Sequence, residues 1–237
     1  MFISFGIIVA YLSFVSLIIA LCSFIVVLAL AMLPGKYWMA KKVCFQQADL
    51  PYQYRLSDFP ADIGKLSVGE MIDFYKVKPN SFNHLIIFGK RQTGKSNMAI
   101  GIGTESSFIL NKVRFATYFN FLQLVDEDTS KRVYFNGKYI WNWNEVEILI
   151  IDDVNPVSEQ GELIKPIDVA SSINSLKNDT KEELLNIKTV WVIGLPETYS
   201  DSLISDWHKM FSECLETEMN KIGCVVLTKP ISQATLP

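Results

Sequence analysis

The chain has 237 residues, enough for one domain with an additional segment. Its 22 basic and 25 acidic residues give a formal net charge of −3, which disfavours a protein that holds nucleic acid on a wide basic face. The four cysteines are scattered without a Cys-x-x-Cys pair and the two histidines are isolated, so neither a disulfide framework nor a zinc site is indicated.

The N-terminal segment is the most apolar part of the chain. Residues 1–34 contain no charged side chain, and a helix needs about 20 apolar residues to cross a bilayer. A cleaved signal peptide would begin with a positively charged region, which is absent here. The pattern predicts a transmembrane anchor over 1–34. Lys36, Lys41 and Lys42 follow it, so the positive-inside rule predicts a single-pass membrane protein with the rest of the chain in the cytoplasm.

Residues 35–83 are predicted to form a juxtamembrane region, which Pro51, Pro60 and Pro79 interrupt. Ser67 and Glu70 have the spacing of a capping box and predict a short helix through 71–75. The third segment, 84–237, is predicted to be the main domain, because it carries the sequence motifs.

A glycine-rich loop follows an apolar run at 85–88, which predicts a strand. The loop sequence is Gly89-Lys90-Arg91-Gln92-Thr93-Gly94-Lys95-Ser96, and it fills every fixed position of the phosphate-binding P-loop motif G-x-x-x-x-G-K-[ST]. Glycines let backbone N–H groups turn toward phosphate, and the N-terminus of the following helix adds positive potential. A Gly/Ser-rich surface turn is the alternative interpretation, and the flanking strand and helix favour the P-loop.

The motif predicts a nucleoside triphosphate and Mg²⁺ as cofactors. ATP is expected rather than GTP, because the N-K-x-D signature by which GTPases read guanine is absent. Lys95 is predicted to reach the β- and γ-phosphates and to act in catalysis, and the Ser96 hydroxyl is predicted to bind the metal. The predicted nucleotide contacts come from the loop and the start of the helix: Gly89, Lys90, Arg91, Gln92, Thr93, Gly94, Lys95, Ser96 and Asn97.

Strands and helices alternate after the P-loop. Further strands are predicted over 113–118, 146–151, 189–193 and 224–227, and helices over 119–125, 167–176, 181–185 and 201–215. Asn136-Gly137 between β-forming residues predicts a hairpin. The sequence therefore predicts an α/β P-loop NTPase fold, with a mainly parallel five-strand sheet between helices and an N-terminal transmembrane helix.

Two carboxylates follow the predicted strand 146–151. Asp152 is predicted to hold Mg²⁺, which is the Walker-B role, and Asp153 is predicted to be the general base that deprotonates the attacking water. The second position is often Glu, and Asp is one methylene shorter. A turn cap before Val154-Asn155-Pro156 is the alternative interpretation of the pair.

The P-loop together with Asp152 and Asp153 resembles the P-loop NTPases of the additional-strand (ASCE) division. The resemblance covers about 85–227 and implies an extra strand between the P-loop strand and the Walker-B strand, ATP hydrolysis and often a ring of subunits. It also implies a polar sensor residue after strand 189–193, where Glu197 and Thr198 are the candidates.

Two branches of that division compete. The small size, the lack of room for a helical lid and the membrane segment resemble compact FtsK–HerA-like packaging ATPases of viruses and phages. The passage 113–122 is similar to the second strand and following helix of DnaA- and DnaC-like AAA+ proteins.

The expected function is a membrane-anchored, Mg²⁺-dependent ATPase that powers translocation or packaging of DNA or another macromolecule. It would work as a homo-oligomer or with a partner protein. The alternatives are an AAA+-like helper ATPase for DNA replication and a non-hydrolysing nucleotide-dependent membrane switch or scaffold.

Overall fold

A computed structural model describes residues 2–59, 68–126, 134–135, 138–155 and 164–228. Contacts divide the chain into two compact units, Met1–Lys42 and Val43–Pro237. The first unit is helical, because α1 (Phe2–Gln47) runs through it with Pro34 inside the helix. The functional division into 1–34, 35–83 and 84–237 stays a prediction.

The structure does not support the membrane anchor that the sequence predicts. A transmembrane helix needs about 20 consecutive, predominantly apolar residues. In the part of the chain that the structure describes, no helix combines that length with that apolarity. The predictions of a transmembrane helix and of a single-pass membrane localisation are therefore contradicted, and the predicted membrane partner has no support.

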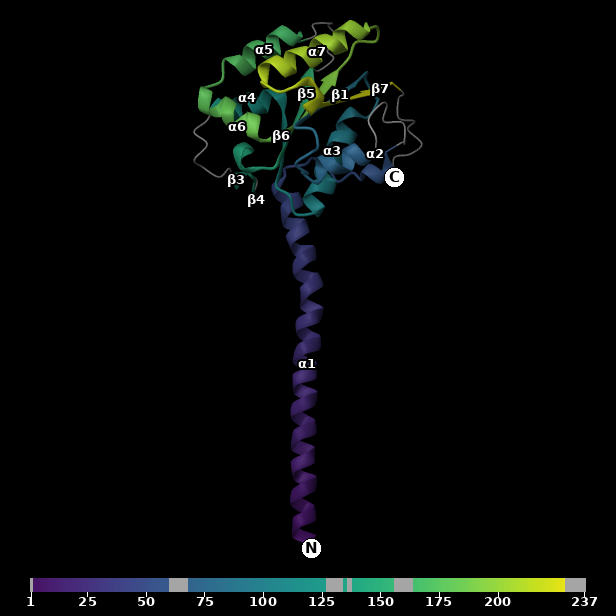
Figure 1. Ribbon diagram of the computed structural model, residues 1–237, viewed down its shortest axis with the longest axis vertical. Helices are drawn as coiled ribbons and strands as arrows, with labels where there is room; N and C mark the ends of the chain where they lie inside the picture. Colours follow the sequence, from purple (N-terminus) through teal and green to yellow (C-terminus); the bar gives the residue numbers. More distant parts are fainter. Residues whose placement is uncertain (1, 60–67, 127–133, 136–137, 156–163, 229–237) are drawn as a thin grey trace. The chain divides into compact units, whose positions relative to one another are not determined.

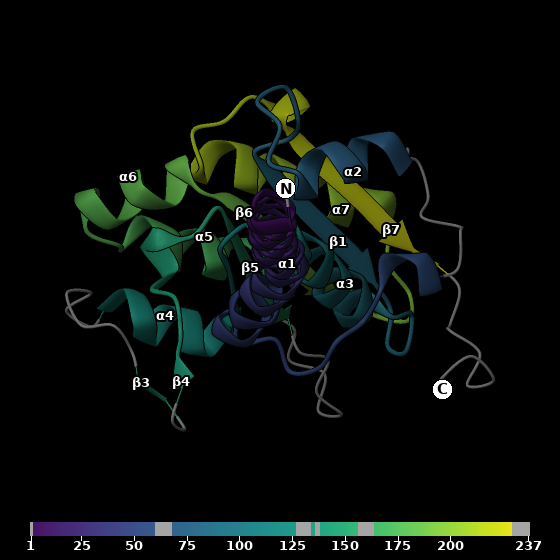
Figure 2. The same cartoon turned by 90° about the horizontal axis from the view of Figure 1, so that it is seen from below.

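The second unit is built on a five-stranded sheet in the order β2-β5-β6-β1-β7. Strands β5, β6, β1 and β7 are labelled in Figures 1 and 2. Every neighbouring pair is parallel. The strands are β1 (His84–Gly89), β2 (Val113–Thr117), β5 (Ile148–Asn155), β6 (Lys188–Gly194) and β7 (Ile222–Leu227). All five predicted strands are confirmed. The extra strand is present as well, because β6 separates β1 from β5.

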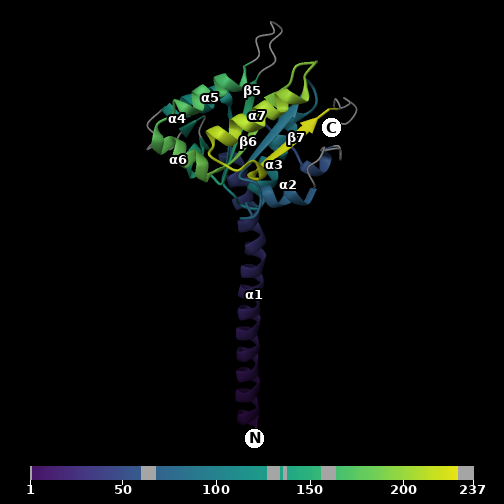
Figure 3. The ribbon, with the colours of Figure 1, turned by 45° about the horizontal axis from the view of Figure 1, so that its top comes forward.

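Helices cover both faces of this sheet (Figure 3). One face is covered by α2 (Val68–Tyr75) and α3 (Lys95–Phe108). The other is covered by α4 (Tyr118–Asp126), α5 (Pro166–Asn174), α6 (Asn178–Asn186) and α7 (Asp201–Cys214). The predicted α/β class, with a parallel sheet between helices, is confirmed.

Alternation along β1 shows why the sheet has two cores. Leu85 and Ile87 join the cluster under α2 and α3, whereas Ile86 and Phe88 join the cluster under α4 to α7. Successive side chains of a strand point to opposite faces. A run of four large apolar residues therefore fits a strand that is buried on both sides.

Short elements complete the unit. The predicted hairpin is present as antiparallel β3 (Tyr134–Phe135) and β4 (Lys138–Tyr139), and its Asn136-Gly137 turn lies outside the described residues. The predicted helix at 71–75 is part of α2, while Ser67 of the predicted capping box also lies outside them. Single turns of 3₁₀-helix are η1 (Leu56–Asp58), η2 (Trp143–Glu145) and η3 (Met219–Lys221).

Strand β5 is longer than predicted, because it continues through both aspartates to Asn155. Its register with β6 shifts between Ile151 and Asn155, and Asp153 has a positive φ of 53°. The chain returns to the sheet at Asn155, whose Nδ2 donates to the Gly194 carbonyl at 3.1 Å and whose Oδ1 accepts from the Ile164 N–H at 3.0 Å. This irregularity changes the direction of the strand locally, as β-bulges do.

The outer edge of β2 is covered by the segment that follows α1. The Phe115 N–H donates to the Ala48 carbonyl at 2.9 Å. Beside it, the buried Arg114 guanidinium forms an ion pair with Asp49, with Nη1 and Oδ2 3.2 Å apart. Residues 48–49 thus lie along the edge of β2 that has no neighbouring strand in the sheet.

The packing of α7 predicts the effect of removing one ring. Phe211 is fully buried, and its ring centroid lies 4.8 Å from that of Trp191 and 6.1 Å from that of Trp207. Phe211→Ala should therefore lower the free energy of unfolding by about 3–5 kcal/mol. The measurement is urea denaturation followed by circular dichroism. Phe119→Ala is the control, because Phe119 is 69% exposed, and it should change stability by about 0.5 kcal/mol or less. Equal losses in both variants would contradict the packing of α7 on the sheet.

Candidate nucleotide-binding site

The P-loop connects the central strand β1 to α3. Strand β1 ends at Gly89 and α3 begins at Lys95, with β6 and β7 on the two sides of β1. The loop therefore lies at the carboxyl edge of the sheet, where ligands bind in open parallel α/β sheets. The backbone N–H groups of the first turn of α3 have no partners within the helix and are free to bind an anion.

Backbone geometry explains the residue types in the loop. Gly94 precedes α3 in the left-handed region, with φ of 82°, where glycine has no steric cost. Gln92 also has a positive φ, of 62°, which is uncommon for a residue with a side chain. A Cβ at Gly89 would come within 2.3 Å of Thr93 Oγ1, so only glycine fits at the start of the loop.

The Lys95 side chain is held by the backbone of the P-loop. Its Nζ donates to the Lys90 carbonyl at 3.0 Å, and Thr93 Oγ1 donates to the same oxygen at 2.9 Å. Burial lowers the pKa of Lys95, while the carboxylates of Asp152 and Asp153 act in the opposite direction. A partly desolvated ammonium group is favourable for binding an anion, because phosphate would restore the charge interactions that burial removes.

Asp152 and Ser96 lie together at this edge of the sheet. Ser96 Oγ, in the first turn of α3, donates to Asp152 Oδ1 at 3.2 Å. The same oxygen accepts the Asp153 N–H at 2.8 Å. Asp152 is 5% exposed. Burial raises the pKa of its carboxyl group, and Asp153 raises it further.

Asp153 occupies a different environment from Asp152. Its side chain is exposed, and its backbone lies in the left-handed region that Asp tolerates better than most residues. The sequence predicts different roles for these two neighbouring acids, metal binding for Asp152 and general-base catalysis for Asp153. In the structure the Asp152 side chain is buried and the Asp153 side chain is exposed, where the register of β5 with β6 shifts.

The other predicted contact residues lie around the loop. Arg91 and Gln92 are exposed, and Thr93 is buried. Lys90 Nζ is 3.9 Å from Glu197 Oε2, so one of the two sensor candidates lies near the loop. Thr198, the other candidate, is exposed. The roles of these residues stay predictions.

Two residues near the site carried no sequence signal. The Tyr52 hydroxyl donates to Asn97 Oδ1 in the first turn of α3. Asn155, 4% exposed, uses its amide to join β5 to the Gly194 carbonyl at the end of β6. Tyr52 lies outside any motif, and only the structure brings it to α3. Asn155 belongs to the triplet Val154-Asn155-Pro156 of the alternative turn interpretation, and in the structure it is the last residue of β5.

The donor set at this edge fits Mg²⁺ together with a nucleotide. Mg²⁺ prefers oxygen ligands and is commonly held by one or two protein groups, several waters and substrate phosphates. The Ser96 hydroxyl and the Asp152 carboxylate are such a pair, and their oxygens already lie 3.2 Å apart. Among the described residues there is no group of three His, Cys, Asp or Glu side chains that could hold a metal ion. Waters and phosphate oxygens would complete the coordination of an ion held by Ser96 and Asp152.

Comparisons with known proteins give distant structural matches. No protein-family model matches the sequence, and no curated protein matches it. Among solved structures, AMPPCP-bound DnaA from Aquifex aeolicus is 17% identical with a TM-score of 0.43, covering 79% of this chain and 52% of that chain. The chain thus spans about half the length of that DnaA structure.

Two further structures match over most of their length. The DnaC helicase loader is 14% identical with a TM-score of 0.43, covering 81% of this chain and 98% of that chain. DnaI is 13% identical with a TM-score of 0.38, covering 78% and 98%. The expected resemblance to FtsK–HerA-like packaging ATPases gains no support from these structures.

The strand order and the loop geometry of the chain itself define the class. The extra strand β6 between β1 and β5, the P-loop between β1 and α3, and the contact of Ser96 with Asp152 together form the arrangement of a P-loop nucleotide-binding fold.

The raised pKa of Asp152 predicts a pH-dependent effect of its removal. The folded protein holds the Asp152 proton more tightly than the unfolded chain does, so this carboxyl group costs stability as the pH rises above the ordinary range of Asp. Asp152→Asn keeps an acceptor for Ser96 and for the Asp153 N–H and removes the charge. It should therefore raise the free energy of unfolding at neutral pH, and the gain should disappear in acid, where wild-type Asp152 is protonated in both states.

Urea denaturation at neutral and acidic pH, without nucleotide or metal, measures this effect. The control is Asp153→Asn, which removes an exposed carboxylate and should give a smaller change at neutral pH. An Asp152→Asn gain of the same size at both pH values would contradict the electrostatic cause.

Proposed function

We propose that this protein is a Mg²⁺-dependent ATPase of the P-loop type. The observation that carries the proposal is the contact between Ser96 Oγ and Asp152 Oδ1 at 3.2 Å. Ser96 comes from α3, which follows β1, and Asp152 from β5, and β6 separates β1 from β5 in the sheet. A surface turn at the P-loop and an unrelated turn cap at Asp152 would have no reason to meet in this way.

Each residue of the site has a chemical role in the proposal. The N–H groups at the start of α3 bind the phosphates, and Lys95 supplies positive charge to the β- and γ-phosphates. Ser96 and Asp152 hold Mg²⁺, which neutralises charge on the phosphates during transfer. Binding the nucleotide would draw the Lys95 ammonium away from the Lys90 carbonyl, where it lies at 3.0 Å.

Asp153 is the proposed general base. Its side chain is exposed and directly follows Asp152 in sequence. A water that attacks the γ-phosphorus must lose a proton while the bond to the ADP oxygen breaks, and a carboxylate within hydrogen-bond reach can accept that proton. Asp152, buried and engaged by Ser96, is the less suitable base.

We further propose that the nucleotide cycle serves a partner, in the manner of the AAA+-like helper ATPases named above. The β2–α4 junction supports this proposal. Thr117 pairs in register with Asp152, and α4 begins at the next residue with Phe119 69% exposed. A partner that contacts this junction would lie close to the residues that hold the nucleotide.

ATP hydrolysis by the full chain tests the main proposal. The wild type should release phosphate from ATP only with Mg²⁺. Lys95→Ala should lower turnover to background, because the charge that stabilises the transferring phosphate is lost. Asp153→Asn should keep nucleotide affinity and lose turnover by about a hundredfold or more, as expected for removal of a general base. The assay is phosphate release, together with the affinity for a fluorescent ATP analogue.

The matched control for Lys95→Ala is Lys209→Ala. Lys209 is exposed on α7 and pairs only weakly with Glu213, at 3.8 Å, so its removal should leave turnover unchanged. ATP binding without turnover in the wild type would favour the nucleotide-switch alternative. Loss of binding in Asp153→Asn would contradict the division of roles between the two aspartates.

The partner proposal predicts that turnover responds to nucleic acid or self-association. The rate of phosphate release should rise several-fold when single- or double-stranded DNA is added, or when the chain forms an oligomer as judged by light scattering. A monomer whose turnover is indifferent to DNA would contradict a DNA-dependent role and leave a protein partner as the effector.

A further inference from the structure

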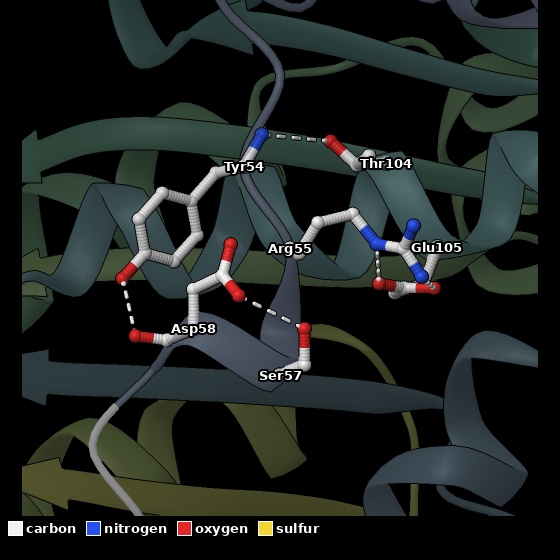
Figure 4. Close-up of polar contacts among 6 residues, drawn as sticks. All are labelled: Tyr54, Arg55, Ser57, Asp58, Thr104 and Glu105. Atoms are coloured by element: carbon white, nitrogen blue, oxygen red, sulfur yellow. Dashed lines mark hydrogen bonds and ion pairs between the residues drawn. The ribbon is translucent and has the colours of Figure 1, made fainter. Parts of the chain in front are cut away.

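A segment between α1 and α2 lies along the P-loop helix. We call residues 49–59 the strap. Arg55 and Glu105 on α3 form a two-point ion pair, with Nε 2.6 Å from Oε1 and Nη2 3.3 Å from Oε2 (Figure 4). One residue earlier, the Tyr54 N–H donates to Thr104 Oγ1 at 3.4 Å. These contacts attach the strap to the C-terminal half of α3.

Apolar contacts fix the strap more closely. The glycines of α3 leave space for two strap leucines, because a Cβ on Gly101 would lie 2.9 Å from Leu56 Cδ2 and a Cβ on Gly103 would lie 2.9 Å from Leu50 Cδ2. Glycine in a helix interior costs about 1 kcal/mol relative to alanine. Gly101 and Gly103 are therefore explained by the strap, whose leucines pack where larger side chains would clash.

Tyr52 is the strap residue that reaches the nucleotide site. Its hydroxyl donates to Asn97 Oδ1, one residue after Ser96 in the first turn of α3. The Tyr52 side chain is 45% exposed, so a ligand or its water shell can reach it. Burial raises the pKa of Tyr52, and the Asp152 carboxylate raises it further. Through Asn97, the Tyr52 hydroxyl is attached to the first turn of α3, which also carries Ser96, the predicted metal ligand.

The hydrogen bond to Asn97 leaves the Tyr52 hydroxyl oxygen able to act as an acceptor. A phenol donates one hydrogen bond and can also accept. Since Asn97 takes the donated bond, the lone pairs of the Tyr52 oxygen remain available as acceptors. Mg²⁺ in nucleotide sites usually keeps several waters, whose hydrogens need acceptors.

We propose that Tyr52 is a positioning residue for the Mg²⁺ end of the nucleotide site. Asn97 orients its hydroxyl, and the hydroxyl oxygen accepts a hydrogen bond from the water shell of the ion. The strap makes this arrangement rigid by holding Tyr52 against α3 through Arg55, Leu50 and Leu56. The inference rests on the proposed function, because it requires that the site bind a Mg²⁺-nucleotide.

Tyr52→Phe tests the proposal, since it keeps the ring and removes the hydroxyl. The full chain is titrated with a fluorescent ATP analogue, once with Mg²⁺ and once with a chelator. The variant should bind the Mg²⁺-nucleotide about fivefold more weakly, as expected for one hydrogen bond of about 1 kcal/mol. Its affinity for the metal-free nucleotide should equal that of the wild type.

Tyr54→Phe is the matched control. Tyr54 is on the same strap, and its hydroxyl donates within the strap to the Asp58 carbonyl at 3.3 Å, so its loss should change neither affinity. Equal Mg²⁺-nucleotide affinities of wild type and Tyr52→Phe would overturn the proposal. So would a loss of the same size with and without Mg²⁺, which would indicate direct contact with the nucleotide or a merely structural role.

A double-mutant cycle with Asn97→Ala tests the orientation step. If Asn97 orients the hydroxyl, Tyr52→Phe should have little further effect on Mg²⁺-nucleotide affinity in the Asn97→Ala background. Additive losses would overturn that step. Failure of the wild type to bind nucleotide at all would instead overturn the proposed function, so the two failures are distinguishable.

Discussion

Burial of the central strands on both faces determines where polar chemistry can lie in this protein. Every residue of β1 is buried, and a buried polar group is costly unless it is hydrogen-bonded. At the amino end of the sheet, buried polar side chains hydrogen-bond to each other: His84 Nδ1 and Thr189 Oγ1 lie 2.7 Å apart. Burial lowers the pKa of His84 to about 4, so this side chain is neutral at neutral pH. At the carboxyl end the strands lead into a loop with unpaired donors, so that end is the one suited to a charged ligand.

The candidate site holds two groups whose charges are unfavourable in the absence of a ligand. Burial lowers the pKa of Lys95 and raises the pKa of Asp152, so each group is shifted toward its neutral form. Each is restrained by hydrogen bonds, to the Lys90 carbonyl and to Ser96 respectively. A phosphate next to Lys95 and a cation next to Asp152 would offset both costs. Part of the binding free energy of a Mg²⁺-nucleotide would then be relief of this desolvation.

The sequence predicts the parts of the fold that depend on local pattern. Apolar runs give the five strands, and the P-loop residue types follow from a tight turn that admits only glycine at Gly89. The extra strand was expected from the resemblance, and the sheet order confirms it. These features depend on short-range periodicity and on backbone sterics, both of which can be read from neighbouring residues.

Other features depend on contacts between residues that are far apart in the chain, and they could not be predicted from local sequence patterns. β5 continues beyond the aspartates because Asn155 bonds to Gly194 and Ile164, and no local pattern reports those partners. Tyr52 reaches Asn97 because the strap follows α3, which requires the glycines of that helix. The expected anchor was inferred from apolarity alone, and the described helices do not support it.

The segment against β2 has a consequence for how the molecule can associate with other chains. An edge strand offers a row of free N–H and C=O groups, which is a template for adding a strand from another molecule. The Ala48 carbonyl occupies the Phe115 donor in the middle of β2, and the Asp49–Arg114 pair lies beside it. A foreign strand could not form a continuous ladder there without displacing both. These two contacts thus hinder the addition of a strand from another molecule along β2.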